Sequence, residues 1–295
     1  MTATQFNGMG VALVTPFKAD LSVDHDSLSA LIDNIIKGGA DYLVVLGTTG
    51  ESATLTPQER RETAATAINA AKGRVPLVLG VGGNSTAAVI NDLRTPGFTD
   101  GFDAVLSVVP FYNKPSQEGI FQHFKAVTEA SPVPVILYNI PSRCGVNMTA
   151  ATTLRVAREC PGAIAVKEAS GNLHQVMDII ADKPERFNVI SGDDGMTLPI
   201  MSLGGSGVIS VAGNAFPRHC SAMVKAFAQG DTLSACTINR SLHNIMELLF
   251  AEGNPAGIKC ALSCMGIIKE YLRLPLVPVS GQLRQTIADA VKSFV

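Results

Sequence analysis

The sequence predicts one α/β domain, a (β/α)8 TIM barrel followed by a helical C-terminal extension. Three observations lead to this prediction. Short runs of apolar and β-branched residues recur from residue 10 to residue 211, stretches with helical periodicity separate them, and residues 231–295 continue as helices without strand signals. Near-continuous apolar strands that alternate with helices are typical of a parallel sheet covered on both sides. Eight such units fit a closed barrel.

The candidate strands are GVALVT (10–15), YLVVLG (42–47), PLVLGV (76–81), AVLSVV (104–109), VPVILYN (133–139), AIAVK (163–167), FNVISG (187–192) and GVISV (207–211). The first helix follows from one apolar face, formed by Leu28, Leu31, Ile32, Ile35 and Ile36 ahead of Gly38 and Gly39. The second begins at Thr56-Pro57-Gln58-Glu59, which has capping-box spacing with proline at the first helical position, and runs to about Gly73. Later helices are predicted over 84–94, 116–129, 149–159, 171–182, 194–203 and 217–229.

The chain shows no linker, low-complexity run or break in composition. We therefore expect residues 1–230 to form the barrel that carries the active site, and residues 231–295 to extend the same domain, with a last apolar stripe at Leu283, Ile287, Val291 and Phe294. A doubly wound open sheet is the competing fold, but it would carry G-x-G-x-x-G after its first strand, and none opens this chain. GVGGNS (80–85) lacks the Lys-Ser/Thr of a phosphate loop and is interpreted as a strand-to-helix turn.

Composition excludes several classes of function. The 23 Lys and Arg residues against 25 Asp and Glu give a net charge of -2, which predicts neither a nucleic-acid partner nor a basic membrane-binding face. The N-terminus has no signal-peptide pattern and no apolar run is long enough to span a bilayer, so we expect a soluble cytoplasmic protein. Six scattered cysteines without a CxxC pair and five widely spaced histidines predict no disulfide framework and no metal site.

The stretch AIAVKEASG (163–171) runs an apolar strand straight into Lys167. By period-two alternation, Ala163 and Ala165 share a face with Lys167, whereas Glu168 points the other way. The simplest interpretation is a strand that ends in solvent. The barrel favours another, because barrel enzymes carry their chemistry at the carboxyl ends of the strands.

Polar residues follow or end several predicted strands: Thr48 and Thr49 after the second, Tyr112 after the fourth, Tyr138 at the fifth, Lys167 at the sixth and Gly192 at the seventh. Each alone has a structural explanation, as a turn, a loop aromatic, a packing residue or a backbone requirement. Together they would meet at one mouth of the barrel.

A buried lysine in that place favours Schiff-base chemistry. With an ordinary pKa near ~10.4, only roughly one amine in 2,500 is neutral at pH 7, and burial raises that fraction. Tyr138, backed by the hydroxyls of Thr48 and Tyr112, could carry protons during imine formation. This chemistry needs no cofactor and no metal, because the protonated imine is itself the electron sink.

GTTGES (47–52), YNIPSR (138–143), VKEASG (166–171) and GVISV (207–211) resemble, in this order and spacing, the dihydrodipicolinate synthases, now called 4-hydroxy-tetrahydrodipicolinate synthases. These belong to the pyruvate-dependent class I aldolase and N-acetylneuraminate lyase superfamily, and the similarity extends from about Gly8 to the C-terminal helices. Arg143 distinguishes this pattern from that of the sialic acid lyases, which usually lack arginine there.

The resemblance implies a role for each matching catalytic residue. Lys167 would form the Schiff base with pyruvate, and Tyr138 would act as general acid and base. Thr48 would relay protons between Tyr138 and Tyr112, and Tyr112 usually reaches into a neighbouring subunit's site.

It also implies the substrates and the residues that bind them. Thr49 would bind the pyruvate carboxylate, and Arg143 the carboxylate of L-aspartate 4-semialdehyde. Gly192 and Ile209 would line the pocket. The implied reaction yields 4-hydroxy-tetrahydrodipicolinate for lysine and diaminopimelate biosynthesis, in a homotetramer built as a dimer of dimers.

Two alternatives to the synthase stay open. The chain could be another pyruvate-linked aldolase or lyase acting on sialic acid or a keto-deoxy sugar acid, or a barrel kept for ligand binding without turnover. Asp193 and Asp194 could suggest a metal-dependent aldolase, but two carboxylates opening a helix are more simply its cap and dipole partner.

Many bacterial family members are inhibited by lysine at a subunit interface. Ser52, Ala53 and Asn84 match that site, whereas Pro57 and Arg60 stand where lysine-sensitive enzymes often carry histidines or other basic residues. Ala88 replaces a glutamate and Phe111 a tyrosine. The glutamate is expected to pair with the inhibitor's ammonium, so we predict weak or absent inhibition by lysine.

Overall fold

The structure, a computed structural model, describes residues 6–294. Its eight strands follow one another in chain order in a closed barrel, which confirms the predicted fold over the doubly wound alternative. All eight predicted strands are present, with β1 starting two residues earlier than expected. They are β1 (Gly8–Ala12), β2 (Tyr42–Val45), β3 (Leu77–Gly80), β4 (Ala104–Val108), β5 (Val135–Asn139), β6 (Ala163–Glu168), β7 (Asn188–Ser191) and β8 (Gly207–Ser210).

The chain forms two compact units, each made of two separate segments. The first unit joins the N-terminal residues to Gly8 with Pro76–Ile209, and the second joins Met9–Val75 with Ser210–Val295. The expected division into a barrel over 1–230 and an extension over 231–295 stays a prediction.

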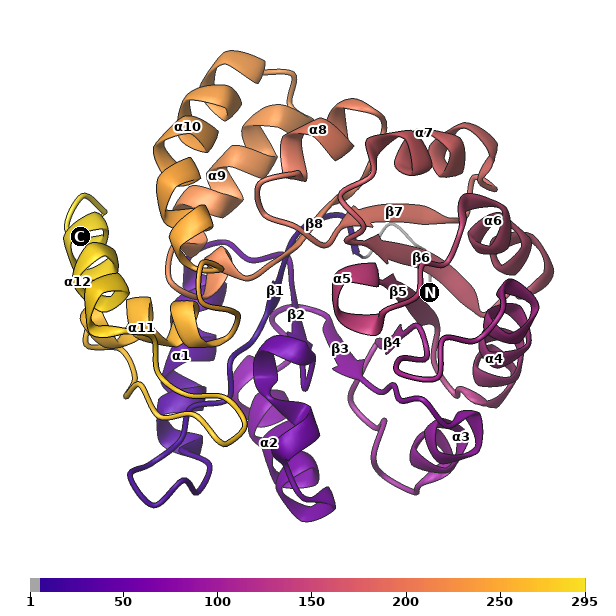
Figure 1. The fold of residues 1–295 in the computed structure, drawn as a ribbon, viewed down its shortest axis with the longest axis horizontal. Helices are drawn as coiled ribbons and strands as arrows, with labels where there is room; N and C mark the ends of the chain where they lie inside the picture. The colour runs from indigo at the N-terminus through magenta and orange to yellow at the C-terminus, as the bar shows by residue number, and fades with distance from the viewer. Residues whose placement is uncertain (1–5, 295) are drawn as a thin grey trace. The chain divides into compact units, whose positions relative to one another are not determined.

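In the first unit, parallel pairing links the strands from β3 to β8. Helices on the outside of these strands each pack against the next along the chain (Figure 1). They are α3 (Thr86–Arg94), α4 (Gln117–Ala130), α6 (Ala150–Glu159), α7 (Leu173–Asp182) and α8 (Thr197–Ser202). The first four begin at side chains that accept a backbone hydrogen bond, namely Ser85, Ser116, Thr149 and Asn172. These caps explain why the chain turns into helix soon after each strand. The short helix α5 (Pro141–Cys144) was not predicted.

In the second unit, β1 and β2 pair in parallel, and α1 (His25–Lys37) packs against α2 (Pro57–Ala71). The predicted capping box is confirmed: Thr56 Oγ1 accepts a hydrogen bond from Glu59 N, and the Glu59 carboxylate accepts one from Thr56 N. The short helices η2 (Thr48–Gly50) and η3 (Ser52–Thr54) lie between β2 and α2.

The C-terminal helices of the second unit confirm the predicted extension. After α9 (Pro217–Ala228) come α10 (Thr232–Leu248), α11 (Ala256–Cys264) and α12 (Gly281–Val291). Helix α10 packs on α9, and α12 packs on α10 and α11 (Figure 1). The predicted apolar stripe of α12 is buried at its three helical positions, and the ring of Phe294 beyond the helix lies 4.8 Å from that of Phe216.

One sequence expectation about β6 is wrong. Val135 aligns with Ala163 but Ile136 aligns with Ala165, so the pairing skips Ile164. Successive residues of β5 face opposite sides, so Ala165 shares a face with the reactive end of the strand and Ala163 does not. The extra residue breaks the alternation on which the prediction depended.

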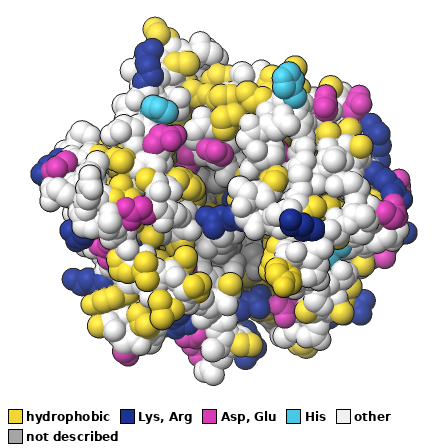
Figure 2. All heavy atoms as spheres, viewed as in Figure 1, with side chains coloured by type: hydrophobic (Ala, Val, Ile, Leu, Met, Phe, Trp, Pro, Cys, Tyr) yellow, Lys and Arg dark blue, Asp and Glu magenta, His cyan; other side chains and the backbone are white. Residues whose placement is uncertain are grey.

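Within residues 6–294, no helix combines the length and the apolar character that a membrane crossing requires. On the face drawn in Figure 2, Lys and Arg side chains lie interspersed with Asp and Glu side chains, in keeping with the small net charge.

Candidate active site

Lys167 is the candidate nucleophile, and the structure buries it. It is the penultimate residue of β6, and its exposed fraction is 5%. The interpretation of this segment as a strand ending in solvent is therefore wrong. Lys167 aligns with Tyr138 of β5 on one side and with Ile190 of β7 on the other. Its Nζ lies 4.3 Å from the centroid of the Tyr138 ring, which is also buried.

The surroundings of Lys167 favour its neutral form. Burial lowers the pKa of Lys167 to about 8; Asp194 opposes this change and Arg143 adds to it. Among the described residues, no hydrogen bond or ion pair ties its Nζ to another side chain. With this pKa, about one amine in ten is neutral at pH 7, so the group can attack a carbonyl carbon.

Gly192 lies beside Lys167, directly after β7, as the sequence predicted. Its backbone N donates a hydrogen bond of 2.8 Å to Glu168 O. A Cβ at this position would lie 3.1 Å from Lys167 Cε and 2.6 Å from the Cβ of Ala169. Glycine therefore leaves room for the lysine side chain to extend.

A buried polar network lies behind Lys167 and Tyr138, on the opposite face of the strands. Glu168 and Asn139 are aligned in register, and Asn139 Nδ2 lies 3.1 Å and 3.2 Å from the two carboxylate oxygens of Glu168. The same carboxylate accepts hydrogen bonds from Gln175 Nε2 at 3.1 Å and from Ser170 N at 2.8 Å. The predicted orientation of Glu168, away from Lys167, is confirmed.

This network joins four segments of the first unit. Asn139 Oδ1 accepts from Met148 N at 3.0 Å, and Asn139 Nδ2 donates to Asn147 Oδ1 at 2.8 Å. Strands β5 and β6, the start of α7 and the segment before α6 are thereby held together, which fixes the alignment of Tyr138 with Lys167. Sequence reasoning missed the network, although its signal was a polar residue directly after each reactive one.

Arg143 and Tyr112 are both exposed in this chain. Arg143 lies in α5, directly after the YNIPS turn, and its charge acts on Lys167 as described above. Tyr112 follows β4, has an exposed fraction of 83% and adopts a left-handed backbone conformation with φ of 71°. Its backbone N donates to Cys144 O at the end of α5, so the two loops are neighbours.

The acidic pair after β7 does not open a helix, contrary to prediction. Helix α8 begins at Thr197 after Met196, and no side chain caps it. Asp193 instead accepts a hydrogen bond from Gly195 N within the preceding turn, and Asp194 is buried. Within residues 6–294, no group of three or more His, Cys, Asp or Glu residues is placed to hold a metal ion.

Thr48 and Thr49 belong to the second unit, where they form η2 with Gly50 directly after β2. Thr49 is buried, and its Oγ1 accepts a hydrogen bond of 3.0 Å from Asn254 Nδ2. Thr15 Oγ1 donates to Gly50 O at 2.7 Å. Thr48 is exposed, and its predicted link to Tyr138 stays a prediction. Ile209, which belongs to the first unit, is fully buried in β8.

A lysine of lowered pKa, aligned with a tyrosine at the carboxyl ends of the strands of a (β/α)8 barrel, defines the class of Schiff-base aldolases. The chain belongs to the dihydrodipicolinate synthetase family, whose model matches residues 5–294. The resemblance drawn from the four sequence motifs is thereby confirmed.

Relatives of known name cover nearly the whole chain. A 4-hydroxy-tetrahydrodipicolinate synthase of Parabacteroides distasonis is 58% identical over 294 residues, which cover 100% of this chain and 99% of the relative. The crystal structure of dihydrodipicolinate synthase from Aquifex aeolicus has a TM-score of 0.94 and 39% identity, covering 98% of each chain. The same four values hold for the enzyme from Cyanidioschyzon merolae, whose crystal structure has lysine bound.

Proposed function

We propose that this protein condenses pyruvate with L-aspartate 4-semialdehyde to give 4-hydroxy-tetrahydrodipicolinate in lysine and diaminopimelate biosynthesis. The observation that carries the proposal is Lys167, buried with a lowered pKa against the ring of Tyr138, in a chain whose relatives carry the name of this synthase. The enzyme is a lyase of the Schiff-base type.

The neutral amine of Lys167 attacks the keto carbon of pyruvate, and loss of water gives a protonated imine. Removal of a proton from the pyruvate methyl group then gives an enamine, with its electrons drawn toward the iminium nitrogen. The enamine carbon attacks the aldehyde of the second substrate. The amino group of that substrate then adds to the imine carbon, closes the ring and releases Lys167. Tyr138 supplies and removes the protons of the carbinolamine steps.

The remaining roles that we propose follow from the resemblance of the motifs to those of the family. Thr49 hydrogen-bonds the pyruvate carboxylate, Arg143 binds the carboxylate of the semialdehyde, and Gly192 and Ile209 line the pocket. Thr48 relays protons between Tyr138 and Tyr112.

The proposal for the oligomeric state rests on Tyr112. Its exposure and left-handed backbone suit a side chain that serves a neighbouring subunit rather than its own. We therefore propose a homotetramer built as a dimer of dimers, located in the cytoplasm.

Borohydride trapping tests the imine. The protein is incubated with pyruvate, reduced and digested, and we expect mass spectrometry to locate a pyruvyl adduct on Lys167. Aspartate semialdehyde is then supplied and its consumption measured. A folded protein that forms no adduct contradicts the proposal. Activity with a sialic or keto-deoxy sugar acid, without activity on the semialdehyde, identifies the alternative aldolase.

We also propose that lysine inhibits this enzyme weakly or not at all. Ala88 is exposed on α3 and offers no carboxylate to an incoming ammonium, and Phe111 has no hydroxyl. A steady-state assay with added lysine measures this directly, and inhibition at micromolar lysine overturns the proposal.

A further inference from the structure

A second buried lysine lies in the second unit, away from any assigned role. Lys259 of α11 has an exposed fraction of 0%. Its Nζ forms an ion pair with Glu51 and donates a hydrogen bond of 3.0 Å to Tyr271 O. The same nitrogen lies 4.1 Å from the centroid of the Phe17 ring. This lysine is therefore fully enclosed, with a carboxylate, a carbonyl oxygen and an aromatic face around its ammonium.

Its partner Glu51 directly follows η2, the turn Thr48–Gly50. Glu51 has an exposed fraction of 4% and a left-handed backbone with φ of 52°, a conformation that favours glycine over a residue with a side chain. An ordinary helix or strand residue would not need this conformation. The left-handed conformation of Glu51 is therefore held by the contacts that its side chain makes.

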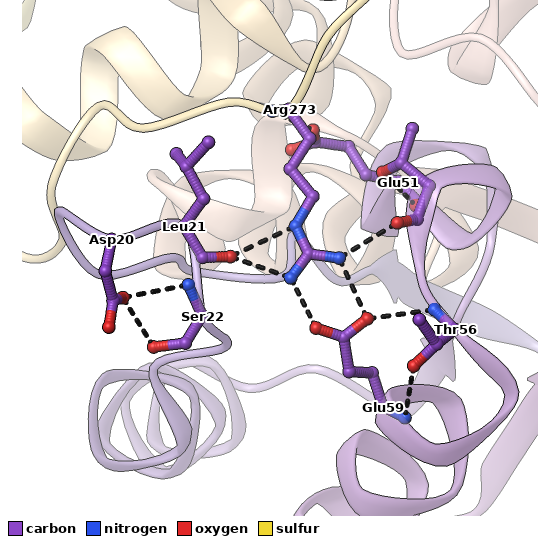
Figure 3. A network of polar contacts seen from close by, with 8 residues as sticks. Asp20, Leu21, Ser22, Glu51, Thr56, Glu59 and Arg273 are labelled. Carbon is purple, nitrogen blue, oxygen red and sulfur yellow. Dashed lines mark hydrogen bonds and ion pairs between the residues drawn. The ribbon is translucent and has the colours of Figure 1, made fainter.

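Arg273 completes the cluster from the segment after α11. Its backbone N donates to the second carboxylate oxygen of Glu51 at 3.2 Å. Figure 3 shows its guanidinium between Leu21 and Glu59, donating to Leu21 O at 2.7 Å and to Glu59 Oε2 at 2.9 Å. It also donates to Thr54 O at 2.9 Å. One C-terminal segment thus ties together the loops after β1 and β2 and the start of α2.

Residues 254–259, around the start of α11, contact the segment 48–51 at two points. Asn254, just ahead of the helix, hydrogen-bonds Thr49 Oγ1, and Lys259, one turn inside it, holds Glu51. Thr49 and Glu51 flank Gly50. Two backbone hydrogen bonds close the turn, one from Gly50 N to Gly47 O and one from Glu51 N to Thr48 O. The turn is therefore held on both sides by residues 254–259, which lead into and begin α11.

A buried ion pair contributes little to stability compared with an apolar pair of the same volume, so its presence calls for another explanation. We propose that Lys259, acting through Glu51, is a positioning residue for the Thr48–Gly50 turn and thereby for binding the carboxylate of the 2-oxo acid substrate. This rests on the proposed function. The helical C-terminal extension then takes part in substrate binding without touching the substrate.

The test uses the double variant Glu51→Gln with Lys259→Met, which removes both charges and so leaves no buried charge without its partner. Steady-state kinetics give KM and kcat for pyruvate, and amide hydrogen exchange reports the opening of residues 48–52. We expect KM for pyruvate to rise by about tenfold or more and exchange at Gly50 and Glu51 to quicken, while KM for the aldehyde changes by less than about twofold.

Two further variants make the test specific. Arg74→Met, in the same unit, removes the exposed ion pair with Asp33 and the hydrogen bonds to Ala70 O and Ala71 O at the end of α2, and should leave both readouts unchanged. Glu51→Asp keeps both charges but shortens the side chain, and should reproduce the change in KM and exchange if the double variant does not fold.

Unchanged exchange at residues 48–52, or faster exchange without any change in KM for pyruvate, would overturn the inference. Exchange that quickens equally throughout the chain would also contradict it, because it shows loss of stability rather than of positioning. If the natural protein forms no pyruvate adduct, the proposed function fails, and the exchange readout still decides whether Lys259 and Glu51 hold the turn.

Discussion

Lys167 and Lys259 are both buried lysines whose pKa is lowered chiefly by burial, yet their surroundings differ in one respect. Lys259 has a carboxylate partner in Glu51, a carbonyl acceptor and an aromatic face. Lys167 has the aromatic face of Tyr138 and, within residues 6–294, neither ion pair nor hydrogen bond at its Nζ. Both lysines are buried, and the two sites differ in the carboxylate partner, which Lys259 has in Glu51.

The difference shows how one residue type serves two purposes. The carboxylate of Glu51 raises the pKa of Lys259 against the effect of burial, which still lowers it to about 8, and the ion pair holds the ammonium in place. Burial lowers the pKa of Lys167 to about 8 as well, but within residues 6–294 no carboxylate is bound to its Nζ, so the neutral amine can attack a substrate carbonyl. Removing each lysine should therefore give opposite results in reactivity and in stability.

The largest effect should appear in reactivity. Lys167→Arg keeps the positive charge but replaces the amine with a guanidinium, which does not lose its proton near neutral pH. We expect borohydride trapping with pyruvate to disappear and kcat to fall by about 10⁴-fold or more. Lys259→Arg is the matched change at the other buried lysine, and any folded protein it gives should still be trapped on Lys167. An adduct on a different lysine would contradict the comparison.

The next effect concerns the stability of the partnered site. Lys259→Met leaves the Glu51 carboxylate buried without its cation, so the free energy of unfolding should fall by about 3–5 kcal/mol. Denaturant unfolding followed by circular dichroism measures the loss. Adding Glu51→Gln should recover most of it. A single variant as stable as the natural protein would show that the pair is not charged or not buried in solution.

The opposite sign is expected at Lys167. Its pKa is about 8 in the native state against an ordinary value of 10.5, so at pH 7 burial of the charge costs up to about 3 kcal/mol. Lys167→Met should therefore stabilise the protein at pH 7. Between about pH 8 and 10.5 the unfolded chain binds more protons than the native one, so the natural protein gains stability as pH rises and the advantage of methionine shrinks. An advantage independent of pH would exclude the charge as its cause.

The two lysines also show what sequence alone can and cannot give. Lys167 was predictable because it ends an apolar strand of known period, and the strand order of a barrel places all such ends at one side. Lys259 stands in a comparably apolar stretch, AGIKCALSC, but its partner Glu51 is 208 residues away along the chain. Periodicity carries no information about a contact over that separation.

Other structural features that the sequence did not predict also have physical explanations. Helix α5 has four residues, fewer than a helical period can reveal. The bulge at Ile164 arises from the pairing of β5 with β6. The alternation of side chains is inferred from the sequence of a single strand, so it cannot reveal a bulge. Glu51 stood inside a quoted motif, but its left-handed backbone and its burial depend on α11 and Arg273, which only the folded chain brings together.

The smallest effect should come from the charges around Lys167 that act at a distance. Asp194 raises the pKa of Lys167 and Arg143 lowers it, so Asp194→Asn should increase the neutral fraction at pH 7 and Arg143→Gln should decrease it. The initial rate of trapping with pyruvate alone should accordingly rise in the first variant and fall in the second, each by about two- to fivefold. Asp193→Asn is the matched control, since its exposed carboxylate accepts from Gly195 N and, among residues 6–294, from no other group. Because burial, Glu51 and Arg273 set the pKa of Lys259, the same three changes should leave its ion pair intact. Rates that move in the same direction for Asp194→Asn and Arg143→Gln would show that these residues act on Lys167 through shape rather than through charge.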